Sequence, residues 1–436
     1  MIFTWKLPIL FLIAGVLALF SGKHTIFAIL SSLVLSVSIV LFIYDYFEIK
    51  KTPKIIIERK SESKLSLGAD NPVHLKIRNP SEKSIYIILR DEYPEGFITE
   101  KNVFEFLIPP KTTLSHTYYI MPTKRGDYSF GNTYIKIRSL LGFLYIINKY
   151  DTSRDVQVYP NLLGMKKYEQ MVLKEKNINQ GYKVMRIKGQ GTEFESLREY
   201  QQDDSFKAID WKATARRGKT VTRVYQEEKS QNIFLCLDTG RLMGSVIEGL
   251  TKLDHSINAA MMLAHVANIK GDKTGLMAFN DNIDVFCMPK SGKSQLLNLL
   301  KITYNIKEVD IDSDYDKAIG YFRKRLTRRS LVVIFTDLID SVSSKPLISQ
   351  VAQLSRKHIC LCVTMSDPAV IDSAYSNIKS VSDAYMSASA RQVLKARKMA
   401  AAKLTQAGAI VIDTMPKEFT PSVVKEYLKL KSTARL

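Results

Sequence analysis

Two apolar stretches without charged residues, joined by a short polar turn, dominate the hydropathy pattern of the N-terminal region. The second stretch, residues 26–44, is long enough to cross the hydrocarbon core of a bilayer as a helix. The first stretch, residues 7–20, is shorter, and Ile2 and Phe3 can lengthen it. A secretory signal peptide is the alternative for residues 7–20, but a second apolar stretch follows at once. The pattern therefore predicts a transmembrane helical hairpin over residues 1–48.

Basic residues follow the second apolar stretch more densely than they occupy the turn between the two stretches. The turn contains Lys23 and His24. The segment after the second stretch contains these basic residues: Lys50, Lys51, Lys54, Arg59 and Lys60. Because the cytoplasmic flanks of membrane helices are enriched in Lys and Arg, the asymmetry places both termini and all later domains in the cytoplasm. The basic segment also suits contact with anionic lipid headgroups.

Short runs that alternate apolar and polar residues fill the region 49–160. Typical runs are Val73–Arg78, Ser84–Arg90, Thr113–Ile120 and Tyr134–Arg138. Alternation with a period of two is typical of half-buried strands, and turns rich in Pro and Gly separate the runs. This region is therefore predicted to be a small antiparallel β-sandwich domain, and it contains no cluster of residues that suggests catalysis.

In the region 232–436, strand-like runs alternate with helical runs. The predicted strands are Ile233–Leu237, Thr274–Phe279, Leu331–Phe335, Ile359–Val363 and Ala409–Ile412. The predicted helices are Leu253–Asn268, Lys293–Asn305, Asp314–Leu326, Lys345–Arg356, Ala388–Gln406 and Pro421–Leu430. This alternation predicts a doubly wound sheet of parallel strands with helices on both faces. Ile283–Cys287 is predicted to form an antiparallel edge, Gly408 to end a helix and Pro421 to begin one.

Residues 161–231 lead into the α/β domain through a run that interleaves aromatic and charged residues. Such a run predicts a semi-buried network in which acidic and basic side chains pair and fasten the segment to the sheet. In that interpretation Trp211 is an anchor in the packing. The alternative is that two carboxylates, such as Asp204 and Asp210, act as a general acid and a general base.

The pattern G-x-E-F-x-x-L-R-x-Y-x-x-D-D-x-x-x-x-I-D-W-x-A-x-A-R in this run resembles the signature of the bacterial family called domain of unknown function 58. The matching residues are Gly191, Glu193, Phe194, Arg198, Tyr200, Asp204, Ile209, Asp210, Trp211, Ala215 and Arg216. The resemblance implies a protein of the bacterial inner membrane that works beside a MoxR-type AAA+ ATPase. The candidates for partner contact or structural support are Glu193, Phe194, Arg198, Tyr200, Asp204, Asp210, Trp211 and Arg216.

Together, the pattern and the resemblance lead us to expect a membrane-anchored α/β protein. It would consist of two N-terminal transmembrane helices, a small β-sandwich domain and a von Willebrand factor A-like doubly wound α/β domain. The von Willebrand factor A assignment rests on the resemblance alone.

Two aspartates, Asp238 and Asp337, follow predicted strands at the sheet edge where doubly wound folds bind ligands. In the von Willebrand factor A fold that the resemblance implies, these positions belong to a metal-ion-dependent adhesion site. Gly240 and Leu242 replace both serines of its Asp-x-Ser-x-Ser loop, and Arg241 adds a positive charge. We therefore expect no metal and no cofactor, with Asp238 paired to Arg241 or capping a nearby helix. The alternative is a Mg²⁺ site formed by Asp238, Thr239, Ser313 and Asp337.

Composition narrows the chemistry further. The net charge of +20 suits an anionic membrane, an acidic protein or a nucleic acid, but no nucleic-acid recognition element is identifiable. The four cysteines lie in apolar strand-like runs, which indicates reduced core residues in a cytoplasmic domain. The histidines lack zinc-ligand spacing, and the sequence contains no complete phosphate-binding loop or nucleophile elbow. The sequence therefore predicts a protein that is not an enzyme.

These observations lead to one main hypothesis and two alternatives. The main hypothesis is a membrane-anchored, non-enzymatic interaction and assembly factor that works with a MoxR-type AAA+ ATPase in the maturation of other proteins. The first alternative is a metal-dependent binding protein or hydrolase that uses a degenerate adhesion site; it fails if Asp204 and Asp210 pair with Arg198 and Arg216. The second alternative is a basic nucleic-acid-binding protein.

Overall fold

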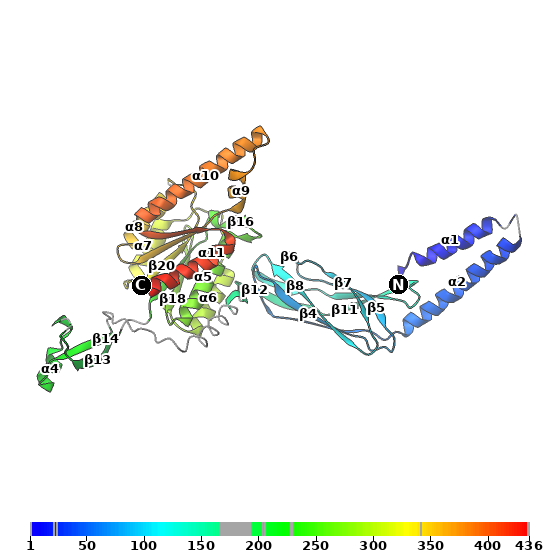
Figure 1. Cartoon of the computed structure of the whole chain (residues 1–436), viewed down its shortest axis with the longest axis horizontal. Coiled ribbons are helices and arrows are strands. Elements are labelled where there is room, and N and C mark those ends of the chain that lie inside the picture. Colours follow the sequence, from blue (N-terminus) through cyan, green and yellow to red (C-terminus); the bar gives the residue numbers. More distant parts are fainter. Residues whose placement is uncertain are drawn as a thin grey trace. The chain divides into compact units, whose positions relative to one another are not determined.

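The chain folds as two compact units, Met1–Tyr159 and Pro160–Leu436 (Figure 1). The computed structural model describes residues 2–20, 22, 25–161, 163–165, 193–202, 204, 206–226, 230–340 and 342–433. Side chains are described for all of these except residues 193–196, 207 and 224–226. Gly191 of the signature pattern therefore lies outside the described residues, as do the side chains of Glu193 and Phe194.

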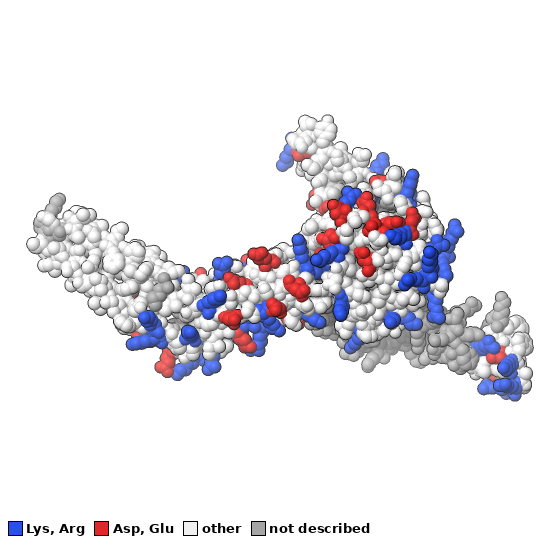
Figure 2. All heavy atoms as spheres, turned by 180° about the vertical axis from the view of Figure 1, so that it is seen from behind, with Lys and Arg blue, Asp and Glu red and all other residues white. Residues whose placement is uncertain are grey.

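Two apolar helices, α1 (Lys6–Leu19) and α2 (Thr25–Lys51), belong to the first unit. They pack along each other, and Ser31 Oγ donates a hydrogen bond to the Ala14 carbonyl at 2.9 Å. Among the described residues, α2 is the one helix that is long and apolar enough to cross a membrane, whereas α1 is a shorter apolar helix. Figure 2 shows the helices free of charged side chains as far as the base of α2. Because α1 is too short to meet this criterion, its role as a second membrane span stays a prediction.

The residues before α1 form a strand, so the prediction that they lengthen the first span is wrong. Strand β1 (Ile2–Phe3) pairs antiparallel with β11 (Leu144–Tyr150). The Thr4 backbone N–H continues this pairing by donating to the Phe143 carbonyl at 2.9 Å. Backbone groups that are bonded in a sheet are not available to a helix, and α1 accordingly begins at Lys6.

Three sheets make up the rest of the first unit. One has the order β2 (Ile56–Ser61), β4 (Asn71–Arg78), β8 (Thr113–Pro122), β6 (Phe97–Ile98). The second has the order β1, β11, β10 (Thr133–Arg138), β5 (Ile85–Asp91), β7 (Val103–Ile108), and the third β3 (Lys64–Ser66), β12 (Arg154–Tyr159), β9 (Gly126–Phe130). Neighbouring strands are antiparallel except β3 and β12. Alternate residues are buried, for example Val73, Leu75 and Ile77 in β4, which explains the period-two pattern.

Arg59 lies in the interior of this unit. Its side chain is 2% exposed and forms an ion pair with Asp91, with 2.7 Å between Nη1 and Oδ1. The same guanidinium donates to the Gly131 carbonyl at 2.8 Å and lies over the ring of Phe130. The sequence grouped Arg59 with cations that face the membrane, and that assignment is wrong because a buried carboxylate neutralises its charge.

The large sheet of the second unit has the order β19-β18-β15-β20-β21-β22. These strands are β15 (Asn232–Asp238), β18 (Lys273–Phe279), β19 (Ile283–Lys290), β20 (Leu331–Phe335), β21 (Ile359–Met365) and β22 (Ala409–Thr414). Neighbours run parallel except β19, which pairs antiparallel with β18. This is the doubly wound order, with its switch point between β15 and β20. The predicted parallel sheet and its antiparallel edge are confirmed.

Helices cover both faces of this sheet, because successive residues of each strand point to opposite sides. On one face, Leu235 and Leu237 pack in a cluster with α5 (Lys252–Ile269), α6 (Lys293–Asn305) and α11 (Pro416–Ser432). On the other face, Phe234 and Cys236 pack in a cluster with α7 (Tyr315–Arg325), α8 (Lys345–Leu354) and α10 (Val381–Gln406). The strands are therefore buried on both sides, which explains their almost continuous apolar sequences.

Two helices near the C-terminus differ from the sequence prediction. Helix α11 begins at Pro416 with Met415 as its N-cap, so Pro421 lies inside the helix rather than at its start. Proline suits the first turn of a helix, and Pro416 already occupies that position. The short helix α9 (Pro368–Tyr375) was not predicted. The predicted end of α10 is confirmed, because Gly408 follows it with a φ of 97°.

The signature segment forms a small antiparallel hairpin. Strand β13 (Glu193–Glu199) pairs with β14 (Val221–Gln226), and the chain between them contains the 3₁₀ turn η1 (Phe206–Ala208) and helix α4 (Trp211–Arg217). Gly218 ends α4 with a φ of 69°, a conformation that favours glycine. These elements place the signature side chains described below.

Candidate functional site

Asp238 ends β15 at the switch point of the large sheet, and its buried carboxylate is surrounded by hydrogen-bond donors. The Tyr315 hydroxyl donates to Oδ2 at 2.8 Å, and the Thr336 hydroxyl donates to the same atom at 2.6 Å. On Oδ1, the Ser313 hydroxyl donates a short hydrogen bond, and the Gly240 backbone N–H donates at 2.9 Å. Both oxygens are therefore occupied by groups of the same chain.

Arg241 does not pair with Asp238, so that prediction is wrong. Its guanidinium instead binds Asp312, with 3.0 Å between Nη2 and Oδ1, and both side chains are largely exposed. The alternative prediction was that Asp238 caps a nearby helix. Its carboxylate does accept the backbone N–H of Gly240, the residue that precedes the short 3₁₀ turn Arg241–Gly244. The partners of Asp238 are therefore neutral hydroxyls in place of the expected Arg241 guanidinium, and the sequence analysis did not predict that these hydroxyls meet.

Gly240 stands where the adhesion-site pattern has a serine, and the structure explains why a larger residue does not fit. A Cβ atom added to Gly240 would collide with Ser313 Oγ and would lie 2.9 Å from the Ile311 carbonyl. The Ser313 hydroxyl thus occupies the space of the missing side chain and binds the Asp238 carboxylate itself. Thr239, the other hydroxyl residue of the alternative Mg²⁺ site, donates its hydroxyl to the Phe279 carbonyl at 3.0 Å.

Asp337, at the end of the adjacent strand β20, is bound by two cations. Lys252 Nζ lies 2.6 Å from Oδ2, and Arg397 Nη1 lies 2.6 Å from Oδ1. The Thr364 hydroxyl donates to Oδ1 at 3.1 Å. Burial opposes the charge of Asp337, but the Arg397 guanidinium and the Lys252 ammonium outweigh it and hold the pKa of this carboxyl below its ordinary range.

Arg397 connects α10 to the ends of three strands. Besides Asp337, its guanidinium reaches the Leu338 carbonyl at 2.7 Å, the Met365 carbonyl at 2.9 Å and Asp413 at 3.2 Å. A guanidinium presents five donors in a fixed plane, which suits this set of acceptors. The contact holds the long helix against the carboxyl edge of β20, β21 and β22.

A cavity of about 400 Å³ lies over this edge. Its described lining includes Asp238, Asp337, Tyr315 and the exposed Arg241–Asp312 pair, together with the start of α8. Burial, followed by the neighbouring Asp238 charge, raises the pKa of Tyr315 well above its ordinary value, so this hydroxyl keeps its proton. The position is the one where doubly wound folds bind ligands.

The residues of this edge do not fit a Mg²⁺ ion. Mg²⁺ requires several oxygen ligands in near-octahedral geometry, whereas the Asp238 oxygens accept hydrogen bonds from hydroxyls and the Asp337 oxygens pair with cationic side chains. Within the part of the chain that the structure describes, no group of three His, Cys, Asp or Glu side chains could hold a metal.

In the signature segment, the acidic residues pair with basic residues of the same segment. Arg198 Nη2 lies 2.5 Å from Asp204 Oδ1, and Arg223 Nε lies 2.8 Å from Asp210 Oδ2. Asp210 also accepts the backbone N–H of Lys212 at 3.0 Å as the N-cap of α4. The Arg223 guanidinium and these backbone donors hold the pKa of Asp210 below its ordinary range. A paired carboxylate with a lowered pKa, such as Asp210, is a poor general acid, which argues against the catalytic interpretation.

The partner of Asp210 is Arg223, whereas the sequence prediction had named Arg216. Arg216 lies in the last turn of α4 and is exposed. The Tyr200 backbone N–H donates to the Thr220 carbonyl at 2.9 Å, and its ring lies 5.9 Å from that of Phe206. These contacts connect parts of the hairpin to each other, whereas the sequence had predicted that they fasten it to the sheet.

Comparison with known proteins assigns a family to this segment and to the edge of the sheet. Residues 196–373 match the family described as "Protein of unknown function DUF58". This part of the chain is thus similar to the DUF58 family. The match includes Asp204, Asp210, Trp211, Asp238 and Asp337. The family resemblance of the signature is therefore confirmed, and the DUF58 segment, residues 196–373, contains all but the first three residues of the hairpin and both carboxylates of the edge.

Relatives of the DUF58 segment occur in several bacteria. The protein YeaD of Bacillus subtilis is 24% identical over 187 residues, which are 40% of this chain and 44% of YeaD. The proteins Mb1516 of Mycobacterium bovis and Rv1480 of Mycobacterium tuberculosis are each 21% identical over 189 residues, which are 43% of this chain and 58% of theirs. The chain thus spans about half the length of these relatives, all of which are described as uncharacterized proteins.

Similarity to solved structures is weak. Proximal thread matrix protein 1 from the mussel byssus aligns at 11% identity with a TM-score of 0.28, over 45% of this chain and 46% of that one. A fragment of α2-macroglobulin from Escherichia coli aligns at 14% identity with a TM-score of 0.22, over 24% of this chain and 17% of that one. These alignments add nothing to the fold described above.

Two aromatic side chains of the DUF58 segment are exposed to solvent. Trp211 is 68% exposed and Phe206 is 75% exposed. The prediction that Trp211 anchors the packing is therefore wrong. The ion pairs that shape the hairpin leave its tryptophan outside, where it can contact another molecule. Exposed aromatic residues on an ordered element are typical of protein-contact surfaces.

A second exposed apolar surface lies outside the DUF58 match, around the connection between α9 and α10 (Figure 1). We call it the apolar tip. Its residues are Tyr375, Ile378, Val381, Tyr385 and Met386. Each of these side chains is more than half exposed, and contiguous exposed apolar surface marks interaction sites.

The sequence reasoning missed Lys252 and Arg397, the two cations that bind Asp337. Arg397 had a usable signal, because it recurs at helical spacing with the buried residues Ala390, Ala400 and Leu404 on one face of α10. A charged residue on a buried helix face requires a partner of opposite charge. Lys252 follows the N-cap Thr251 at the start of α5 and had no comparable signal.

Proposed function

We propose that this chain is a membrane-anchored, non-enzymatic protein-binding factor whose partner is a MoxR-type AAA+ ATPase. The observation that carries the proposal is the exposed Trp211 on a DUF58 hairpin that is stabilised by its own ion pairs. Such a hairpin presents an aromatic side chain in a fixed position, which lowers the entropic cost of binding. The identity of the partner follows from the family resemblance.

Membrane anchoring is the second part of the proposal. Helix α2 has the length and composition of a membrane span. Helix α1, extended by the polar turn, would complete a hairpin and leave both termini on one side. The basic residues after α2 favour the cytoplasm for the domains that follow. The proposed location is therefore the cytoplasmic face of a bacterial inner membrane.

A von Willebrand factor A-like core without a metal is the third part. The strand order and the position of Asp238 support it, and Ser313, Tyr315 and Thr336 supply hydroxyls to the carboxylate. In this proposal the edge would bind partners through hydrogen bonds and shape rather than through a bridging ion. The saturated carboxylates also argue against the metal-dependent hydrolase.

The test is a pull-down of the tagged full-length protein in mild detergent, with and without ATP. The binding variant combines Trp211→Ala with Phe206→Ala. The matched control is Trp5→Ala, since Trp5 is a similarly exposed tryptophan in the first unit. We expect an AAA+ ATPase, identified by mass spectrometry, with wild type and control, and at least about tenfold lower recovery with the binding variant.

Two results would overturn parts of the proposal. Absence of any AAA+ ATPase from the wild-type sample would remove the partner. Equal recovery with the binding variant would move the contact away from the hairpin, and a Tyr385→Ser, Val381→Ser variant would then test the apolar tip. A stoichiometric divalent metal in the purified protein, lost in Asp238→Ala, would restore the metal-dependent alternative.

A further inference from the structure

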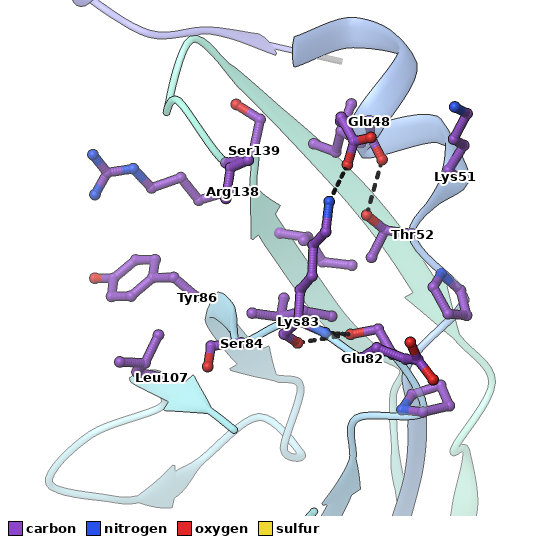
Figure 3. A pocket seen from close by; sticks show the side chains of 17 residues that line it. Glu48, Lys51, Thr52, Glu82, Lys83, Ser84, Tyr86, Leu107, Arg138 and Ser139 are labelled. Carbon is purple, nitrogen blue, oxygen red and sulfur yellow. Dashed lines mark hydrogen bonds and ion pairs between the residues drawn. The ribbon is translucent and has the colours of Figure 1, made fainter. Parts of the chain in front are cut away.

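A cavity of about 640 Å³ lies at the base of α2, where the helix meets the sheets of the first unit (Figure 3). The last turn of α2 and the residues after it form one wall. The turn between β4 and β5 and the end of β10 form the others. Neither the DUF58 match nor the proposed partner contact involves this cavity, because residues 196–373 lie in the other unit.

A buried carboxylate fixes α2 at this position. Asp45 is fully buried, and its oxygens accept the Leu141 backbone N–H at 2.9 Å and the Phe143 backbone N–H at 3.2 Å. The Ser139 hydroxyl donates to the same carboxylate. The helix and the loop between β10 and β11 are therefore a single rigid element, and the cavity has a fixed place along the helix.

That place corresponds to the depth of lipid headgroups. The uncharged part of α2 ends at Tyr44, and the cavity begins at Glu48. With a rise of about 1.5 Å per residue, four residues advance about 6 Å along the helix. The headgroup layer on each side of a bilayer is roughly 5–8 Å thick. If α2 spans the membrane as proposed, the cavity opens among the headgroups.

The charges of the cavity favour a phosphate. Its two carboxylates already have partners, since Lys83 Nζ lies 2.6 Å from Glu48 and Lys111 Nζ lies 2.9 Å from Glu82. Figure 3 shows Lys83 crossing the cavity toward Glu48, with Lys51 and Arg138 on opposite sides. Because Lys51 and Arg138 add two positive charges to a lining whose acids are neutralised, the cavity is electropositive.

The apolar part of the lining suits the rest of a phospholipid. Ile49, Pro53 and Pro80 contribute to the walls, and two side chains at the rim, Leu107 and Leu140, are more than half exposed. Exposed leucines beside a cationic cavity match an amphiphile, with phosphate inside and acyl chains along the helix. A free phosphate ion would leave this apolar rim in water.

We infer that this cavity binds the headgroup of an anionic phospholipid, with Lys51 and Arg138 supplying the positive charge that attracts it. The inference rests on the proposed membrane anchoring by α2. It extends that proposal by giving the anchored protein a site that distinguishes one lipid class from another.

The test uses the full-length protein in nanodiscs of phosphatidylcholine with or without phosphatidylglycerol, released into mild detergent and examined by native mass spectrometry. We expect retained phosphatidylglycerol on the wild type and roughly thirtyfold less on Lys51→Gln, Arg138→Gln, about fivefold for each positive charge removed. The charge-keeping variant Lys51→Arg, Arg138→Lys should retain it. Inorganic phosphate at equal concentration should not displace the lipid.

A matched control removes two exposed cations elsewhere in the same unit. Lys101 and Lys124 lie beside the opposite ends of the strands, near Val103 and Pro122. The variant Lys101→Gln, Lys124→Gln should keep the lipid. Equal loss in this control, or equal retention in the cavity variant, would overturn the inference. Release of the protein from membranes by buffer alone would instead disprove the anchoring.

Discussion

Asp238 and Asp337 end neighbouring strands of one sheet, yet they are stabilised in opposite ways. Asp238 accepts hydrogen bonds from hydroxyls and a backbone N–H, so its immediate partners are neutral. Asp337 lies between Lys252 and Arg397, so its surroundings are charged. The position of an aspartate at a strand end therefore does not determine which groups bind its carboxylate. The helices and loops packed against the strand end determine this. Asp238 shapes the cavity, whereas Asp337 fastens α5 and α10.

The largest effect is expected from Asp337→Ala, which leaves Lys252 buried without its acidic partner and Arg397 with Asp413 alone. Breaking a buried ion pair from one side costs about 3–5 kcal/mol. We expect a loss of that size in the free energy of unfolding of the second unit, measured by urea titration and pulse proteolysis of the detergent-solubilised full chain. The variant Asp337→Ala, Lys252→Met, Arg397→Met should recover much of the loss; no recovery would contradict the assignment.

The stability of the second unit at acid pH should report on the Asp337 ion pairs. The folded-state pKa of Asp337 is lowered below its ordinary value of 3.8, so its contribution is complete above that pH and is lost as the pH falls through the folded value. In wild type, the stability of the second unit should therefore decline below about pH 4. The variant Asp337→Asn starts lower and should lack this part of the decline; parallel curves would contradict it.

Asp238→Asn should have an intermediate effect. The asparagine amide replaces one acceptor oxygen, but the hydroxyls of Tyr315 and Thr336 can turn and accept from it, so we expect a loss of about 1–3 kcal/mol. The same urea titration measures it. A loss as large as that of Asp337→Ala would mean that Asp238 has a charged partner after all.

Tyr315→Phe should cost less, about 1 kcal/mol for one hydrogen bond to Asp238. It also provides an alkaline counterpart to the acid experiment. Burial and the Asp238 charge raise the pKa of Tyr315 above its ordinary value of 10.0, so its contribution is lost as the pH rises above that value. Wild type should lose stability there and Tyr315→Phe should lose less, as followed by thermal unfolding at increasing pH.

The smallest effect is expected from Asp312→Asn at the mouth of the same cavity. The Arg241 and Asp312 side chains are 59% and 79% exposed, and exposed ion pairs contribute about 0–1 kcal/mol. We expect an unfolding midpoint within error of wild type at moderate salt. A large loss would mean that the Arg241–Asp312 ion pair is shielded from solvent, in contradiction to its exposure here.

The sequence predicted the large sheet well because both of its faces are buried. Strands such as β20 and β21 are continuous apolar runs between turn signals, and their bounds follow from composition alone. The antiparallel edge strand β19 was also predicted correctly. Local ambiguity caused the errors: two prolines competed for the start of α11, and Ile2 and Phe3 suited a strand as well as a helix.

The site was less predictable because its contacts join residues far apart in the chain. Asp238 meets Ser313 and Thr336, and no short-range pattern announces these contacts. Charged residues were the least reliable guide. Arg59 was read as surface charge and is core, whereas Asp45 interrupts an apolar helix and went unremarked, although a carboxylate there requires buried donors.

The Asp45 contact has a consequence for how the first unit is oriented. A helix joined to a domain through a loose linker leaves the domain free to turn about the helix axis. Here three donors around one carboxylate fix that angle, so the orientational entropy of the tether is already lost before anything binds. Every copy of the first unit would therefore hold its β-sheets at the same angle about the axis of α2.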